Sequence, residues 1–363
     1  MRLSQAKQLP SGAWRVQITV NGKRVSITKD NKTEAENAAL VLKFSQPNTP
    51  SSAKKEVAKT LTVSGAIDMY IHDKKGALSV STVRSYRIMQ KYRFKSIMNL
   101  PLSSNINWQL VVTEETKCHV VRVYKGRVIE TKTLLSAKTI KNMWTLIEAV
   151  LNYFKQPVPE DITLPMVVLT EHEFLEPDEI RIFLKAIEGH RYELPYLLCL
   201  HGLRRSEMLA ITKADIIVQK SKDKKPYIHV HGAMVYDEHN KLVEKKTNKT
   251  PGSTREVPIS IPRLLELVEQ MPDGKLCNAS PSSMTNPLNV VLKNNDLPEV
   301  GLHGLRHTFV SLCYHLRIPT LVTKKWGGYS PKSTVVEYIY THLAKKDEAE
   351  SLTKMEDFYR DFV

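Results

Sequence analysis

The chain has 363 residues and a formal net charge of +15, because 53 Lys and Arg side chains outnumber 38 Asp and Glu. Its 42% hydrophobic and 25% charged residues are typical of a folded protein of two or three domains and exclude a basic disordered tail. Apolar runs long enough for a signal peptide or a membrane span are missing, which predicts a soluble protein that stays where it is made. The four cysteines are far apart, so they predict neither a zinc site nor disulfides and favour a reducing compartment. The positive charge favours a polyanionic partner, since each cation that neutralises a phosphate releases a counterion, and a merely solvated basic surface is the alternative.

Residues 13–28 predict a β-hairpin. Alternating apolar and polar residues flank Asn21-Gly22, and this dipeptide favours a type I′ turn, in which both central residues need positive φ. Because side chains alternate across a strand, Val16 and Ile18 are expected on a packed face and the polar residues between them on the other face.

A helix over 33–44, with Thr33 as its N-cap, is expected to cover the packed face of the hairpin. The opposite face is basic, and Arg15, Lys23 and Arg24 are candidates for contacting DNA. A solvated hairpin surface is the alternative for these three residues.

A helical region is predicted from 61 to 154, between two breaks. Residues 45–59 are rich in Pro, Ser and Thr and have no apolar periodicity, which predicts a flexible linker. The proline-containing segment 156–161 marks the second break, after which a third region begins.

Apolar residues at helical spacing predict helices after residue 61, over 79–97 and over 136–154. The stretches 110–112 and 120–129 predict the two strands of a short hairpin with a basic solvent face. The periodic apolar residues are expected to form a core.

The third region contains two polar motifs. Arg204 and Arg205 follow Gly202, which ends an apolar helix, so they are expected to open the next helix as an anion site or to pair with a carboxylate. About a hundred residues later, His303 and Arg306 are three apart and share one helical face, a spacing that is weak evidence by itself.

Five motifs follow one another in a specific order: GLRRSE at 202–207, a lysine before a strand at 249, HGLRHTF at 303–309, GGYS at 327–330 and YTHL at 340–343. This ordered set resembles the tyrosine recombinase or phage integrase family. The resemblance covers the whole chain and implies a multidomain α+β fold. It comprises a small N-terminal β-hairpin or three-stranded sheet with a helix, a helical core-binding domain, and a mainly α catalytic domain with a small β-sheet. The implied boundaries are an arm-type DNA-binding domain at 1–46, a linker at 47–60, a core-binding domain at 61–157 and a catalytic domain at 168–363.

The resemblance assigns catalytic roles to the cations. Breaking a phosphodiester without a metal requires neutralisation of the charge that develops on the nonbridging oxygens, a nucleophile, and protonation of the leaving 5′-oxygen. Arg204 and Arg306 are the implied bidentate clamp, and His303 donates to the same phosphate or acts as an acid or base.

Lys249 is implied as the acid that protonates the leaving oxygen, with Lys246 as the alternative. Glu207 is expected to orient the cationic groups from behind, or to be a first-turn carboxylate of its helix.

Tyrosines complete the implied site. The resemblance implies Gly-His, or less often Gly-Trp, ahead of the nucleophile, whereas this chain has Gly327-Gly328-Tyr329 and lacks the second histidine. Tyr329 is expected to supply the missing hydrogen-bond donor. Tyr340 is the expected nucleophile and Tyr338 the alternative, because two residues apart on a helix means about 200° of rotation and only one of them can face the phosphate.

The implied activity is site-specific recombination through a 3′-phosphotyrosine, which integrates or excises a phage or other mobile element, including viral genome integration, without cofactor or metal. The implied partners are double-stranded DNA at core and arm sites, three further copies of the chain in a homotetramer on synapsed DNA, and accessory DNA-bending or directionality factors. No membrane is involved, and the expected location is the nucleoid in the cytoplasm of a bacterial host. Residues 344–363 are expected to pack onto a neighbouring protomer, or as an amphipathic helix on their own domain. The alternatives are a catalytically impaired DNA-binding regulator of the same fold and an enzyme like type IB topoisomerase.

Overall fold

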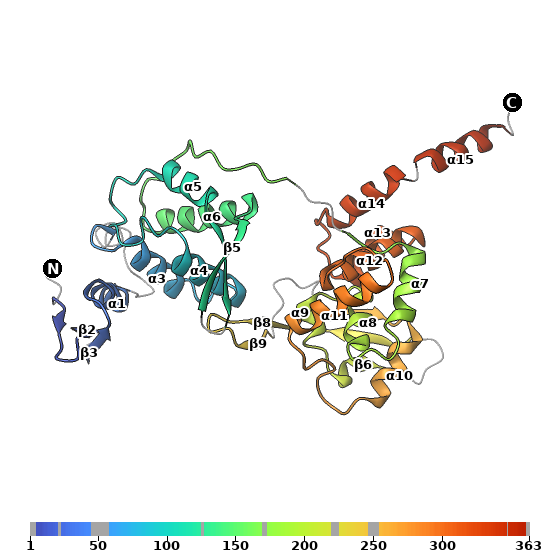
Figure 1. Cartoon of the computed structure of the whole chain (residues 1–363), viewed down its shortest axis with the longest axis horizontal. Helices are drawn as coiled ribbons and strands as arrows, with labels where there is room; N and C mark the ends of the chain where they lie inside the picture. Colours follow the sequence, from blue (N-terminus) through green and yellow to red (C-terminus); the bar gives the residue numbers. More distant parts are fainter. Residues whose placement is uncertain are drawn as a thin grey trace. The chain divides into compact units, whose positions relative to one another are not determined.

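The computed structural model describes residues 5–20, 23–44, 58–124, 127–168, 173–218, 225–245, 254–346 and 348–360. The chain forms two compact units, residues 1–169 with 236–241 and residues 170–235 with 242–363. Each unit combines short helices with small sheets (Figure 1), which confirms the multidomain α+β prediction. Within the described ranges, no helix has the length and apolar character needed to cross a bilayer.

The first unit begins with a three-stranded antiparallel sheet in the order β1-β2-β3. The pairing of Val20 with Lys23 confirms the predicted hairpin, although Asn21 and Gly22 lie outside the described residues. Val16 and Ile18 are buried while the alternate residues of their strand are exposed, as expected. The strands are β1 (Lys7–Gln8), β2 (Trp14–Val20) and β3 (Lys23–Lys29).

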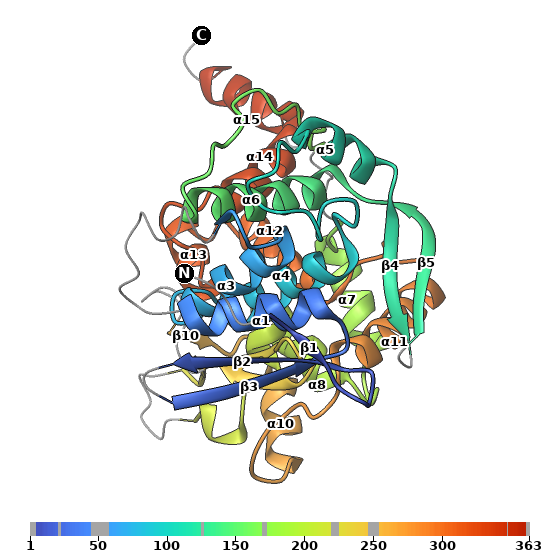
Figure 2. The ribbon, with the colours of Figure 1, turned by 90° about the vertical axis from the view of Figure 1, so that its left-hand side faces the viewer.

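Helix α1 (Lys32–Phe44) lies along this sheet (Figure 2) and buries Ala35 and Ala39. The predicted N-cap was wrong. The side-chain oxygen of Asn31 accepts a hydrogen bond from the main-chain nitrogen of Glu34 at 2.8 Å, so Asn31 caps the helix and Thr33 lies inside it. Asparagine is among the strongest N-cap residues, which accounts for the earlier start.

The rest of the first unit is mainly helical, as predicted, and encloses its own hydrophobic core. Ser79 and Ser136 cap two of the predicted helices through their side chains. The helix predicted to reach residue 97 ends at Tyr92, shortly before Phe94, whose φ is 54°. The elements are α3 (Val63–Asp73), α4 (Val80–Tyr92), α5 (Trp108–Thr116), β4 (His119–Tyr124), β5 (Arg127–Leu134) and α6 (Ala137–Tyr153).

The prediction of a strand at 110–112 was wrong, because these residues belong to helix α5. Asn107 caps this helix through its side chain, and Trp108, Val111 and Val112 are buried at helical spacing. The hairpin consists of β4 and β5 instead.

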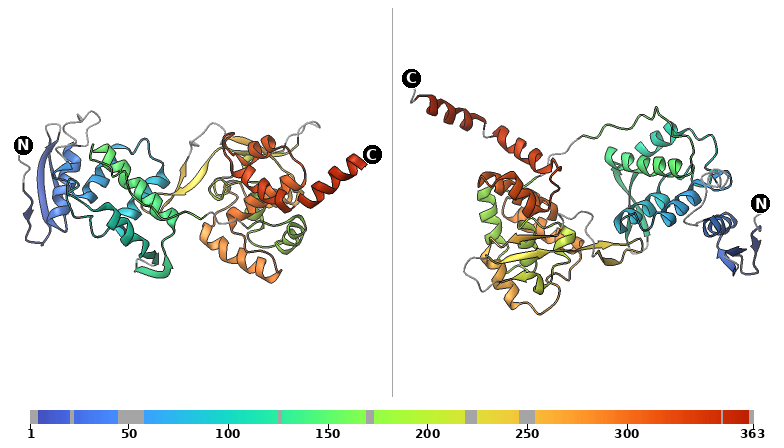
Figure 3. Two further views of the ribbon diagram at one scale, coloured as in Figure 1. Left: turned by 90° about the horizontal axis from the view of Figure 1, so that it is seen from above. Right: turned by 180° about the vertical axis from the view of Figure 1, so that it is seen from behind.

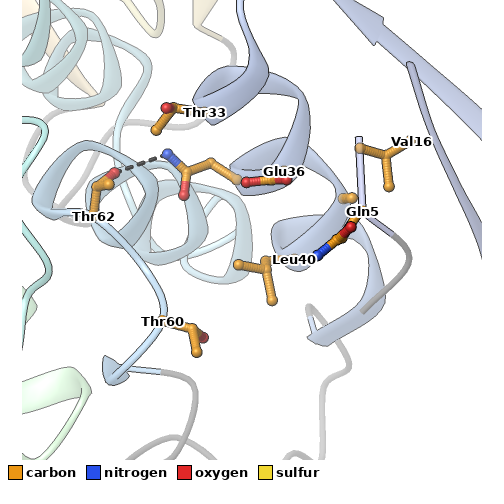
Figure 4. Close-up of a pocket in the computed structure, with 9 residues that line it drawn as sticks. Gln5, Val16, Thr33, Glu36, Leu40, Thr60 and Thr62 are labelled. Atoms are coloured by element: carbon orange, nitrogen blue, oxygen red, sulfur yellow. Dashed lines mark hydrogen bonds between the residues drawn. The ribbon is translucent and has the colours of Figure 1, made fainter. Parts of the chain in front are cut away.

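A cavity of about 250 Å³ lies where α1 approaches the segment before α3 (Figure 4). The side-chain amide of Asn37 donates a hydrogen bond to Oγ1 of Thr62 at 2.8 Å beside it. The cavity is lined by Gln5, Val16, Thr33, Glu36, Asn37, Ala39, Leu40, Thr60 and Thr62. None of these residues belongs to the five motifs.

The second unit surrounds the fully buried helix α8. Helix α12 packs against α8 and α14, and α13 packs against α12 and β10. The antiparallel sheet of the second unit has the strand order β10-β7-β6, and β8 pairs with β9 in a separate two-stranded sheet. The elements are α7 (Pro177–Ala186), α8 (Glu193–Leu200), α9 (Arg205–Met208), the 3-10 helix η1 (Lys213–Asp215), β6 (Ile216–Ile217), β7 (Tyr227–Val230), β8 (Ala233–Tyr236), β9 (Leu242–Lys245), β10 (Arg255–Pro258), α10 (Pro262–Gln270), α11 (Pro281–Asn294), α12 (Leu302–His315), α13 (Thr320–Gly327), α14 (Val335–Lys346) and α15 (Glu348–Arg360).

Helix α15 extends beyond α14, away from the other elements of the second unit (Figure 3). Its large apolar side chains are 55% to 61% exposed: Leu352, Met355, Phe358 and Tyr359. An apolar stripe at helical spacing therefore faces solvent in the single chain.

Candidate active site

Arg204 lies at the turn between α8 and α9. Gly202 ends α8 with a φ of +80°, and a Cβ there would meet Cδ1 of Phe309 at 2.7 Å, so this position requires glycine. Helix α9 is a single turn, and Glu207 Oε2 already accepts a hydrogen bond from the main-chain nitrogen of Arg204 at 2.8 Å. Arg204 is thus paired with a carboxylate, as one of the two predictions for this turn expected, and its role at an anion site stays a prediction.

Three guanidinium groups converge on Glu207, which is only 2% exposed. Arg204 Nη1 lies 2.6 Å from Oε1, Arg255 Nη2 lies 2.9 Å from Oε2, and Arg306 Nη1 lies 3.8 Å from Oε2. We call these four residues the arginine cluster. Burial by itself raises the pKa of Glu207, but the hydrogen bond and charge of Arg255 and the charge of Arg204 outweigh it and lower the pKa. One carboxylate against three guanidinium groups leaves the cluster strongly positive.

Arg306 is 1% exposed and is held from several directions. Its Nη1 donates to the carbonyl oxygen of Gly202 at 2.6 Å, and its Nε donates to the hydroxyl of Tyr329 at 3.1 Å. The guanidinium carbon also lies 4.2 Å from the centre of the Tyr329 ring, a cation–π contact. Within the described residues, Nη2 is buried without a hydrogen-bond partner. Burial lowers the pKa of Arg306 to about 10, so the group stays charged at neutral pH.

The Gly327-Gly328 turn connects the arginine cluster to Tyr329 through hydrogen bonds to main-chain carbonyl oxygens. Arg204 Nη2 donates to the carbonyl oxygen of Gly328, and Arg255 Nε donates to that of Trp326, each at 2.6 Å. Gly328 has a φ of +63°, and a Cβ there would lie 2.6 Å from Nη1 of Arg255. Any other residue would be strained at this position and would collide with the guanidinium.

Arg255 was missed by the sequence analysis. A signal existed, because Arg255 and Val257 are in the same phase of strand β10 and both are buried. An arginine in the inward phase of a strand needs a buried anion, and Glu207 supplies it.

His303 is exposed on α12, one turn before Arg306, and its ring meets that of His307 edge to face at 4.7 Å. Lys249 and Lys246 lie outside the described residues, in the segment between β9 and β10.

Tyr340 and Tyr338 occupy different environments on α14. Tyr338 is 43% exposed. Tyr340 is half-buried, its hydroxyl lies 2.9 Å from Oγ1 of Thr323 on α13, and its ring packs edge-on against Tyr314. Burial raises the pKa of Tyr340. The contacts of the Tyr340 hydroxyl are therefore with α13 rather than with the arginine cluster.

The candidate DNA-contacting residues of the N-terminal sheet are solvent-exposed. Arg15 points out from β2, where its Nε donates to Oγ1 of Thr28 at 3.5 Å. Arg24 is exposed on β3, while the side chain of Lys23 lies outside the described residues.

Comparison with known proteins finds sequences similar to this chain among recombinases and integrases. No protein-family model matches the chain. The tyrosine recombinase XerC-like protein of Caldanaerobacter subterraneus subsp. tengcongensis is 25% identical over 62% of this chain and 67% of its own length. The ICEBs1 integrase of Bacillus subtilis strain 168 is 24% identical over 97% of this chain and 99% of its own length.

Two solved structures share the fold. The Tn1549 transposon integrase, determined in complex with transposon right-end DNA, matches with a TM-score of 0.57 and 17% identity over 81% of this chain and 100% of that chain. A lambda integrase dimer bound to a core site matches with a TM-score of 0.52 and 13% identity over 93% of this chain and 94% of that chain. In sequence the chain is similar to a tyrosine recombinase and to an integrase, and it shares the fold of solved integrases. Its similarity to the ICEBs1 integrase extends over almost its full length.

Proposed function

We propose that this recombinase cuts and rejoins double-stranded DNA at specific sites through a covalent 3′-phosphotyrosine, and thereby integrates or excises a phage or other mobile element. The observation that carries the proposal is the convergence of Arg204, Arg255 and Arg306 on the single carboxylate of Glu207. A buried set of donors with excess positive charge is suited to a phosphodiester whose negative charge grows in the transition state.

Arg204 and Arg306 bind the nonbridging oxygens of the scissile phosphate. The contacts of Arg306 with Gly202 and Tyr329 fix the direction of its guanidinium before DNA arrives, so little reorganisation is needed during the reaction. Its buried Nη2, without a partner among the described residues, is a donor that a phosphate oxygen would satisfy.

Tyr329 takes the place of the second histidine of the family. Its hydroxyl oxygen accepts from Arg306, which leaves its own proton available for a phosphate oxygen. His303, one turn before Arg306 on α12, donates to the same phosphate or acts as a general acid or base. Lys249, or Lys246 as the alternative, protonates the leaving 5′-oxygen.

Tyr340 is the nucleophile, with Tyr338 as the alternative. Its hydroxyl pairs with Thr323, and attack exchanges this hydrogen bond for contact with the phosphate. Attack forms a bond between the tyrosine oxygen and phosphorus and releases the 5′-hydroxyl. The 5′-hydroxyl of the partner duplex then reverses the reaction, so the stored phosphotyrosine bond makes an external energy source unnecessary.

Arg255 acts through its neighbours as a positioning residue. It pairs with both carboxylate oxygens of Glu207 and donates to the carbonyl oxygen of Trp326, three residues before Tyr329. An Arg255→Lys variant keeps the charge but loses the fork of donors. It is expected to lower the rate of covalent complex formation more than the affinity for DNA.

The assembly proposed is a homotetramer on two synapsed duplexes. The exposed apolar stripe of α15 supports packing of this helix onto a neighbouring protomer. The arm-type domain at 1–46, which contains the N-terminal sheet, binds arm sites. The linker at 47–60 joins it to the core-binding domain at 61–157. The core-binding domain and the catalytic domain at 168–363 together bind the core site. Accessory DNA-bending or directionality factors are proposed as further partners. The proposed location is the nucleoid of a bacterial host.

The test uses a nicked duplex carrying the ends of the mobile element, on which a cleaved strand diffuses away and the covalent complex accumulates. The expected result is a covalent complex with the wild-type chain and with Tyr338→Phe, and none with Tyr340→Phe. Peptide mapping then places the DNA on Tyr340. Covalent complex in both single variants and in the double variant would overturn the mechanism.

Two rival functions give different outcomes. A regulator that has lost the chemistry binds the duplex without any covalent complex. An enzyme like type IB topoisomerase relaxes supercoiled plasmid without producing recombinants.

A further inference from the structure

The outer face of the β10-β7-β6 sheet brings together two imidazoles and a carboxylate. The side-chain donor atoms of Asp215, His229 and His231 all lie within 4.8 Å of one another. We infer that these three residues form a binding site for a divalent transition metal, with zinc as the natural ion.

The site is assembled by strand pairing. His229 and His231 are two residues apart along β7 and its continuation, so they project from the same face, and their ring centroids are 5.2 Å apart. Asp215 ends η1 directly before β6, and the pairing of Ile216 with Ile228 carries it to the histidines. The sequence analysis predicted no metal site, because thirteen residues separate Asp215 from His229 and only the fold brings them together.

Asp215 is oriented as a metal ligand would be. It is 7% exposed, and its Oδ2 accepts hydrogen bonds from the main-chain nitrogen and Oγ1 of Thr212 at 2.8 and 2.7 Å. Its Oδ1 is directed at Nε2 of His231, 2.8 Å away. Anchoring of the non-ligating oxygen by neighbouring donors is the arrangement that fixes carboxylate ligands in metal sites.

Imidazole and carboxylate ligands suit zinc, which takes three protein ligands and water in an open tetrahedron. Ligands about 2.1 Å from zinc lie roughly 3.4 Å apart in that geometry. His229 is half-buried and His231 exposed, so side-chain rotation can close the difference from the observed spread. Glu256, exposed and directly across from His229 in the register, adds negative charge to the same face.

A metal ion at this site would link the edge strand β6 to the central strand β7. Strand β6 has only two residues, whereas β7 is the central strand and also pairs with β10, which begins at Arg255. The ion would therefore stabilise the second unit.

The experiment uses the full chain without a polyhistidine tag, stripped of metal with a chelator and then dialysed. Cys118 is replaced by serine throughout, because it is the one free cysteine that is not buried. Zinc is titrated by calorimetry, bound metal is counted by mass spectrometry, and cobalt is added as a spectroscopic probe of tetrahedral coordination. The expected result is one zinc per chain and a rise of about 5 °C in the unfolding midpoint at a free zinc concentration well above Kd.

Three variants decide the outcome. The double variant His229→Gln/His231→Gln is expected to lose both the bound zinc and the thermal shift. His239→Gln, which removes an exposed histidine outside the cluster, is expected to keep both. Thr212→Val removes only the hydroxyl behind Asp215 and is expected to weaken zinc binding by about 10- to 100-fold. Failure of the parent chain to bind zinc in the titration, or the same stoichiometry and shift in the double variant, overturns the inference.

Discussion

Arginine serves two opposite purposes in the arginine cluster and in the N-terminal sheet. In the cluster, Arg255 and Arg306 are almost completely buried and their guanidinium groups are fixed around Glu207. On the sheet, Arg15 and Arg24 are exposed, and Nε of Arg15 donates a long hydrogen bond, of 3.5 Å, to Oγ1 of Thr28.

The difference teaches that a net charge of +15 does not describe one function. Buried guanidinium groups depend on a specific anion, so they control folding and chemistry. Exposed ones interact through a high-dielectric solvent with screening by salt, so they control affinity for a polyanion. Substitutions in the two regions should therefore change different measured quantities.

The largest effect is expected from Glu207→Gln, which leaves three arginines around a neutral amide. Breaking a buried ion pair leaves uncompensated charge, and we expect a loss of about 3–5 kcal/mol in the free energy of unfolding. The measurement is urea denaturation at pH 7. Asp178→Asn is the control, because its pair with Arg181 is 80–88% exposed and contributes at most about 0.5 kcal/mol. Equal losses in the two variants would remove the distinction between buried and exposed charge.

Arg306→Lys is expected to reduce covalent complex formation by about 10²- to 10³-fold, because an ammonium group cannot replace the separate donors to Gly202, Tyr329 and the phosphate. Single-turnover cleavage of the nicked duplex measures it. Binding of intact duplex should change little. A variant that is folded and cleaves at the wild-type rate would contradict the assigned role.

His201 gives a smaller effect that depends on pH. Burial lowers its pKa from 6.5 to about 4. As the pH falls, His201 is therefore protonated in the unfolded chain before it is protonated in the folded chain. The contribution of buried, neutral His201 to stability is present above pH 6.5 and is lost as the pH falls toward 4. The shift corresponds to about 3 kcal/mol.

The check is the free energy of unfolding of the wild type and of His201→Gln between pH 7 and pH 4.5. A flatter dependence is expected for the variant. Glu207 contributes in a lower window, since its lowered pKa stabilises the fold above about pH 4.5 and this stabilisation is lost in stronger acid. If the free energies of unfolding of the wild type and of His201→Gln changed in parallel with pH above pH 4.5, His201 would have to be protonated in the folded chain as readily as in the unfolded chain.

The smallest effect is expected from Arg15→Gln and Arg24→Gln. Each is expected to reduce the slope of log binding constant against log salt by about one, with no change in covalent complex formation on a core site. Fluorescence anisotropy over a series of salt concentrations measures the slope. Unchanged slopes would assign these residues to a solvated surface.

Local patterns in the sequence were sufficient for much of the fold. The hairpin at 13–28 follows from side-chain alternation and a two-residue turn, and the helices capped by Ser79 and Ser136 follow from periodicity and capping. The strand predicted at 110–112 failed because three apolar residues fit a helix as well as a strand, and the cap at Asn107 decided between them.

The sequence by itself determined the order of the motifs and the residue types at the site, because these depend on neighbours along the chain. Tertiary structure alone decided that Arg255 reaches Glu207, that Tyr340 pairs with Thr323, and that Asp215 meets two histidines. Each of these contacts joins side chains from different elements. The physical reason is that buried charge must find its partner in space, and strand pairing and helix packing set that distance rather than sequence separation.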